Sequence, residues 1–255
     1  MKMLINKKLL YTGVVCILMS GTNLLAKSAT STDVLVDAET IKAISQDLAK
    51  NYFYIQQGIQ TSSAKKGLKK DMITLDDTIR KLQISATTKD KGVVEFMFFS
   101  VDELKSTIKE DFSAENGGLI LDYTETLLEG SESIAKHNKG KTESMLGVVE
   151  EMAFLLERAT KYYIAFRAGY TDAVNITQAE LAVKKFEILL TKVQAHTYPG
   201  PLTTGPIKKL SKYWPVSKNF YLGIKKSELP TIVFISTKHM KSALDKLIEY
   251  HKKNN

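Results

Sequence analysis

The spacing of apolar residues constrains the fold of this chain more than any other feature of the sequence. From about residue 36 onwards, apolar side chains recur every three or four positions through most of the chain. The first such stripe comprises Ile41, Ile44, Leu48, Tyr52 and Ile55. Because this spacing places side chains on one face of an α-helix, it predicts an all-α fold.

The first half of the chain contains four such stripes, separated by short polar stretches. They predict helices over about residues 36–60, 64–84, 92–109 and 119–137. Asp37 is expected to cap the first helix, and residues 115–118 (Glu-Asn-Gly-Gly) are expected to end the third before the fourth begins. Four amphipathic helices joined by short connections predict an up-down four-helix bundle.

The same order of helices returns in the second half of the chain, which indicates an internal repeat. At a shift of 111 positions the two halves match without a gap at first, and the match resumes after an insertion at residues 197–201. The matched pairs include Ile44 with Leu155, Lys50 with Lys161, Tyr52 with Tyr163, Gly58 with Gly169, and, past the insertion, Phe98 with Trp214. The sequence therefore predicts two tandem four-helix up-down bundles, over residues 33–138 and 141–255. Their polar junction near residues 136–142 leaves open whether they stack end to end or lie side by side.

The first thirty residues have the composition of a secretory signal peptide. Residues 1–8 contain three lysines, and residues 9–19 form an apolar run that small residues follow. This run is shorter than the roughly twenty residues that a membrane-spanning helix needs. Residues 1–29 are therefore interpreted as a removable signal, with cleavage after Ala26 or Ala29 and an uncleaved anchor as the alternative. This interpretation makes the protein periplasmic or secreted.

Removal of the leader changes the charge and the chemistry expected of the chain. The formal charge of +8 falls to +5 on cleavage after Ala26, which removes Lys2, Lys7 and Lys8 and leaves 33 basic against 28 acidic residues. The only cysteine, Cys16, lies in the leader, so a mature chain has neither disulfides nor thiolate metal ligands. The remaining lysines are interspersed with acidic residues, which is typical of solvated helix faces. Nucleic acid is therefore not an expected partner.

One segment of the first predicted helix resembles a known family. Residues 44–52 read Ile-Ser-Gln-Asp-Leu-Ala-Lys-Asn-Tyr and are similar to the Leu-Ser-Gln-Arg-Met-Ala-Lys-x-Tyr signature of the N-terminal domain of type IV pili methyl-accepting chemotaxis transducers. This PilJ-like domain is similar to the periplasmic nitrate-sensing bundle of NarX-type histidine kinases. The resemblance covers both halves and implies a sensory, ligand-binding helical bundle.

The resemblance also implies where a small anion would bind. Members of the family carry one arginine before the signature and one inside it; here these places are Lys42 and Asp47 in the first copy, and Ala153 and Arg158 in the second. An arginine offers paired donors to a planar oxyanion and a lysine only a point charge, so the family's site is altered in this chain. The candidate ligand-binding residues are Lys42, Gln46, Lys50, Tyr52, Arg158, Lys161 and Tyr163. Their alternative interpretation is structural, with Lys50 and Lys161 as solvated neighbours of core tyrosines.

The sequence contains no motif of a known catalytic or metal site. It has no nucleophile elbow, no His-Glu-x-x-His helix and no phosphate loop. Adjacent carboxylates such as Asp76 and Asp77 diverge around a helix. His137 and His251 fit the C-terminal ends of helices, where a positive side chain is favourable, better than they fit a metal site. We therefore expect neither catalysis, nor a metal, nor a cofactor.

Two functions from different classes follow from the sequence. The first is a periplasmic sensory or ligand-binding accessory module that binds a small anionic solute and docks on a membrane-bound receptor. The second is a structural or protein-interaction protein of the cell envelope, and an envelope enzyme without a known motif is a distant third. Basic groups that converge between the first helices of the two copies would favour the first function, and a dry apolar interior would favour the second.

Overall fold

The structure is a computed structural model that describes residues 31–138, 144–198, 200–226 and 228–254. Within these residues the fold is entirely helical, which confirms the all-α prediction. The helices are α1 (Ser31–Gln56), α2 (Thr61–Ser85), α3 (Lys91–Thr107), α4 (Ala114–Asn138), α5 (Met145–Arg167), α6 (Ala173–Ala195), α7 (Pro201–Leu222) and α8 (Pro230–Asn254).

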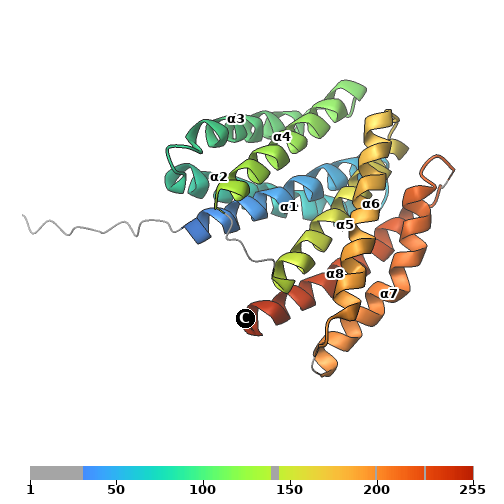
Figure 1. Cartoon of the computed structure of the whole chain (residues 1–255). Coiled ribbons are helices and arrows are strands. Elements are labelled where there is room, and N and C mark those ends of the chain that lie inside the picture. The colour runs from blue at the N-terminus through green and yellow to red at the C-terminus, as the bar shows by residue number, and fades with distance from the viewer. Residues whose placement is uncertain (1–30, 139–143, 199, 227, 255) are drawn as a thin grey trace, which may run out of the picture.

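The order of helix contacts is the same in α1–α4, called here the first half, and in α5–α8, the second half. In the first half α1 packs against α2 and α4, and α3 also packs against α2 and α4 (Figure 1). In the second half α5 packs against α6 and α8, while α7 lies against those two. The two halves meet where α1 packs against α5, so they lie side by side and not end to end.

Each half has its own hydrophobic core, but the two cores exchange a few side chains. The first core is built from α1–α4, and it takes in Ile164 and Ala165 from the end of α5. The second core is built from α5–α8, and it takes in Leu128 from α4. Because burial of apolar side chains is favourable, these exchanged residues help to hold the halves together.

The turns that follow α1 and α5 are equivalent in detail. Gly58 and Gly169 both adopt positive φ, at 67° and 104°. In each turn the amide after the glycine donates to a carbonyl five residues back, at 2.9 Å in the first half and 3.0 Å in the second. This is the Schellman arrangement that ends a helix, and it favours glycine because a Cβ disfavours positive φ. The pairing of these glycines in the sequence thus has a structural basis.

Two expected helix boundaries are wrong. Asp37 does not cap the first helix, because α1 already begins at Ser31. Residues 115–118 do not separate the third and fourth helices either, because they lie in the first turns of α4. Ser113 caps α4 instead, since its Oγ accepts from the Asn116 amide at 3.0 Å.

The glycine at position 117 has a packing role. A Cβ built on Gly117 would come within 1.8 Å of the Tyr170 hydroxyl, which donates to backbone carbonyls of residues 113 and 114. Tyr170 lies in the connection between α5 and α6, so this glycine lets a residue of the second half lie directly against the α4 backbone of the first half. Gly117 therefore serves close packing and does not break the helix.

Several sequence predictions fall outside the described residues. The proposed signal peptide at 1–29 lies there, as does most of the junction between the predicted bundles, at residues 139–143. Within the described part of the chain, no helix combines the length and the apolar character needed to cross a membrane.

Candidate functional site

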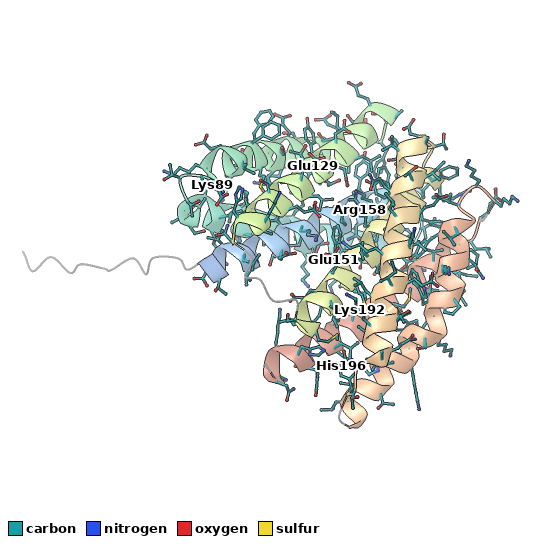
Figure 2. All side chains as sticks on the ribbon, viewed as in Figure 1. Lys89, Glu129, Glu151, Arg158, Lys192 and His196 are labelled. Carbon is teal, nitrogen blue, oxygen red and sulfur yellow. The ribbon has the colours of Figure 1, made fainter. Side chains whose placement is uncertain are left out.

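The seven candidate ligand-binding residues all lie on α1 or α5, and all are buried. Five of them, the charged and amide side chains, lie at the contact between these helices. Figure 2 labels Arg158 in this central region. The interpretation of Lys50 and Lys161 as solvated neighbours of tyrosines is wrong, since Lys50 is 8% exposed and Lys161 is fully buried.

The two tyrosines of the set belong to the cores. Tyr52 packs edge-on against Phe53 and Phe112, with ring centroids 5.4 and 5.2 Å apart. Tyr163 packs edge-on against Tyr221 at 6.0 Å. The structure therefore does not bring the tyrosines together with the charged residues around a common site.

Arg158 is the centre of the first group of charges, called here the Arg158 cluster. Its guanidinium donates two hydrogen bonds to the Glu125 carboxylate of α4, at 2.9 and 2.8 Å. It also donates to the side-chain oxygens of Gln46 on α1, at 3.2 Å, and Gln178 on α6, at 3.0 Å. Lys161, one turn further along α5, pairs with the same Glu125 carboxylate. Four helices thus supply one site in which two cations share a single carboxylate.

This sharing explains the pKa values in the Arg158 cluster. Burial alone would raise the pKa of Glu125, but Lys161 and Arg158 outweigh it and lower the pKa to about 2. Burial, together with repulsion from Arg158, lowers the pKa of Lys161 to about 8, although Glu125 partly opposes the shift. Burial is thus the largest cause of the low pKa of Lys161, and the one carboxylate that it shares with Arg158 does not offset it. The side chain of Glu125 is 28% exposed, so the cluster reaches solvent at this carboxylate.

A second group of charges, called here the Lys50 cluster, lies between α1, α5 and α8. Lys50 pairs with Asp47 and with Glu157, and Lys241 of α8 pairs with the same two carboxylates. Burial disfavours ionisation of Lys50, but the two carboxylates outweigh it and raise its pKa. Here two cations pair with two anions, so these four charges balance.

Lys42 lies further along α1 and has its own partners. It donates to Glu151 of α5 at 2.7 Å, and its ammonium lies 4.3 Å from the centre of the Phe154 ring. Glu132 lies 3.7 Å away. Lys42 is therefore separate from the Arg158 cluster and is surrounded by carboxylates.

The two clusters occupy equivalent places with reversed charge. At the shift of 111 positions, Asp47 corresponds to Arg158. Asp47 of α1 pairs with Lys241 on the fourth helix of the second half, and Arg158 of α5 pairs with Glu125 on the fourth helix of the first half. Each first helix thus makes a charged contact with the fourth helix of the other half, with acid and base exchanged.

Sequence reasoning missed the partners in these clusters. Glu125 and Lys241 lie on α4 and α8, which do not carry the signature. Glu151 lies on α5, before the residues that match the signature. Nothing in the local spacing of a helix reveals a carboxylate that reaches it from another helix. Glu125 lies 33 residues from Arg158, and Lys241 lies 194 residues from Asp47.

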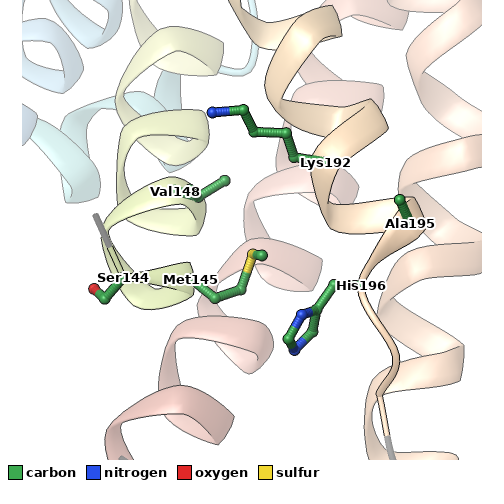
Figure 3. A pocket seen from close by; sticks show the side chains of 6 residues that line it. All are labelled: Ser144, Met145, Val148, Lys192, Ala195 and His196. Carbon is green, nitrogen blue, oxygen red and sulfur yellow. The ribbon is translucent and has the colours of Figure 1, made fainter. Parts of the chain in front are cut away.

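Two hollows on the surface lie away from the clusters. One, of about 420 Å³, lies between the start of α5 and the end of α6 and is lined by Ser144, Met145, Val148, Lys192, Ala195 and His196 (Figure 3). The other, of about 390 Å³, lies between α3 and α4 and includes Phe96, Met97 and Gly130. Gly130 is tightly packed, since a Cβ there would come within 2.5 Å of the Met97 sulfur. This packing brings α3 close to α4 and leaves Phe96 on the rim.

The described residues contain no group of three or more His, Cys, Asp or Glu side chains that could hold a metal ion. A scan against protein-family models, a search of curated proteins and a search of solved structures found no match to this chain.

Proposed function

We propose that the protein is a non-catalytic solute-binding module of the cell envelope, built from two tandem four-helix up-down bundles and related to the PilJ-like sensory domains. The tandem arrangement is supported by the equivalent helix contacts and by the matching turns at Gly58 and Gly169. In this proposal the leader directs export, and the bound state is presented to a membrane-bound receptor. The solute is a small anion.

The observation that carries this proposal is the excess of positive charge in the Arg158 cluster. Arg158 and Lys161 are buried and share one carboxylate, while the four charges of the adjoining Lys50 cluster balance. Gln46 and Gln178 have side-chain amides next to the guanidinium, and amides also donate to oxyanions. In this proposal a solute carboxylate or oxyanion takes the place of Glu125, whose side chain is 28% exposed. The arginine then supplies the paired donors that suit a planar anion.

The test is thermal unfolding of the chain from Lys27 with a panel of small anions that includes nitrate, nitrite and acetate. A ligand that binds only the folded state raises the midpoint in a saturable way. Arg158→Ala is expected to abolish the shift. Glu125→Gln is expected to increase the affinity roughly tenfold or more, because the competing carboxylate is removed.

The matched control is Arg80→Ala, which removes an exposed arginine paired with Asp76 on α2. This variant should bind anions as the unaltered chain does. If no anion shifts the midpoint of either the unaltered chain or Glu125→Gln, solute binding at this cluster is ruled out.

A second candidate function, protein interaction without a solute, is favoured by the outer face of α3. Phe96 and Phe99 are 62% and 56% exposed, next to the groove between α3 and α4. Aromatic side chains at such exposure are typical of interaction surfaces. Under this alternative, Phe96→Ser with Phe99→Ser would abolish co-purification of envelope partners while Arg158→Ala would not.

A further inference from the structure

The formal charge of the molecule is divided unevenly between its halves. Residues 31–138 contain 13 basic and 18 acidic side chains, a formal charge of −5. Residues 144–254 contain 17 basic and 9 acidic side chains, a formal charge of +8. The chain therefore has one acidic and one basic half, although its total charge suggests an evenly basic protein.

The basic charge of the second half is concentrated on α7 and the residues after it. No acidic residue occurs between Glu187 and Glu228. This stretch contributes five exposed lysines that form no ion pair with any described residue, and these are Lys208, Lys209, Lys212, Lys225 and Lys226. Lys218, by contrast, pairs with Glu187 of α6.

The register of α7 places Lys208 and Lys212 on one outer face, one turn apart, and Lys225 and Lys226 follow in the turn just after the helix. Val216 and Leu222, which are 45% and 47% exposed, flank this row. The outer face of α7 thus combines unpaired lysines with exposed aliphatic side chains; we call it the α7 face.

The α7 face lies at the edge of the molecule. Its helix packs against α8 and α6 and only slightly against α5, so it makes no contact with the first half (Figure 1). The equivalent helix of the first half, α3, contains two basic and three acidic residues. The basic face is therefore a property of α7 and not of this position in both halves.

We propose that the α7 face docks on the surface of a bilayer that contains anionic phospholipids. Lysines on long flexible stems suit a layer of mobile anionic headgroups, and interspersed aliphatic side chains can enter the boundary between headgroups and acyl chains. The acidic first half is repelled by the same surface, so the charge distribution orients the molecule with α7 towards the lipid. An acidic protein would need opposing carboxylates at fixed positions and would gain less from Val216 and Leu222.

The test is co-sedimentation of the chain from Lys27, which keeps every described helix, with vesicles of phosphatidylcholine that contain or lack phosphatidylglycerol. We expect binding only to the vesicles with phosphatidylglycerol, and weaker binding as salt is added. The variant in which Lys208, Lys212 and Lys226 are changed to glutamine should bind roughly 100-fold more weakly, since each lysine near an anionic surface contributes roughly fivefold.

The matched control carries the same loss of charge in the first half, with Lys65, Lys66 and Lys69 on α2 changed to glutamine; these lysines are also exposed. It should keep its affinity within about twofold. Equal binding to both kinds of vesicle, or an equal effect of the two triple variants, would overturn the proposal. Binding to polyglutamate-coated beads without binding to phosphatidylglycerol vesicles would also overturn it and would indicate an acidic protein partner. The variants leave the Arg158 cluster intact, so failure of this test does not bear on anion binding.

Discussion

Lys50 and Lys161 occupy equivalent positions in the two halves, yet their surroundings differ in the number of carboxylates. Lys50 pairs with Asp47 and Glu157, and its pKa is raised despite burial. Lys161 has only Glu125, which it shares with Arg158, and its pKa falls to about 8. The comparison shows that a repeated helix can keep the same lysine while its chemistry is decided by residues from other helices. Both clusters join the halves, and we propose that the Arg158 cluster, which has fewer carboxylates per cation, also binds an anion.

The largest effect on unfolding free energy is expected at the equivalent positions 46 and 157, where the two halves carry different residues. Glu157 is 3% exposed and pairs with two lysines, so Glu157→Ala leaves both to share the single carboxylate of Asp47 and should cost about 3–5 kcal/mol of unfolding free energy. Gln46, at the equivalent place, accepts one hydrogen bond from Arg158, and Gln46→Ala should cost about 1–2 kcal/mol. Urea unfolding of both variants measures the difference. Equal losses would break the distinction between the two clusters.

A smaller effect, on the pH dependence of stability, is expected from a residue that only the first half contains. Burial and the nearby Asp47 raise the pKa of Asp71 to about 6, although Lys241 and Lys50 partly oppose this. Asp71 also accepts a hydrogen bond from Asn51 at 3.2 Å, and it faces Glu157 of α5. The equivalent position in the second half is Ala182.

Because the pKa of Asp71 is higher in the folded chain than in the unfolded chain, its contribution to stability is complete below about pH 4. It is lost as the pH rises through about 6. The unfolding free energy should therefore fall by about 1–2 kcal/mol less between pH 4 and pH 6 in Asp71→Asn than in the unaltered chain, as measured by urea unfolding at each pH. An unchanged profile would mean that Asp71 titrates as it does in water.

The smallest effects concern the turns, where the halves are expected to agree. Gly58→Ala and Gly169→Ala should each cost about 1–2 kcal/mol, because both glycines have positive φ and alanine disfavours it. Gly205 of α7 is exposed, with open space around its Cα, so Gly205→Ala should instead stabilise the protein by about 0.5–1 kcal/mol. Thermal unfolding measures all three. A loss at only one of the two turns would weaken the equivalence of the halves.

The helices could be predicted from the sequence because periodic burial is a local property. The stripe at Ile41 to Ile55 became the buried face of α1, and the glycine pair at 58 and 169 marked real helix ends. The error at residues 115–118 has a cause outside the local sequence. At Gly117 the sequence shows a helix breaker, but the Tyr170 ring that requires the glycine comes from another part of the chain.

The charged clusters could be predicted only in part. The signature singles out positions on the first helix of each half, and the structure shows that Gln46, Lys50, Arg158 and Lys161 are buried there. Their partners Glu125 and Lys241 reach them across the interface between the halves, and such contacts leave no periodic signal. The basic α7 face is visible in the sequence as the absence of acidic residues between Glu187 and Glu228. The composition of the whole chain does not reveal it.

The most direct test of the account is a titration of Lys161 by NMR with labelled lysine side chains, with Lys50 as the internal comparison. A midpoint near pH 8 is expected for Lys161, because burial lowers its pKa and the one carboxylate that it shares with Arg158 does not offset this, and no titration of Lys50 is expected in that range. A midpoint of Lys161 near the ordinary value of about 10.4 would show that its charge is fully compensated, and it would contradict the proposed anion site.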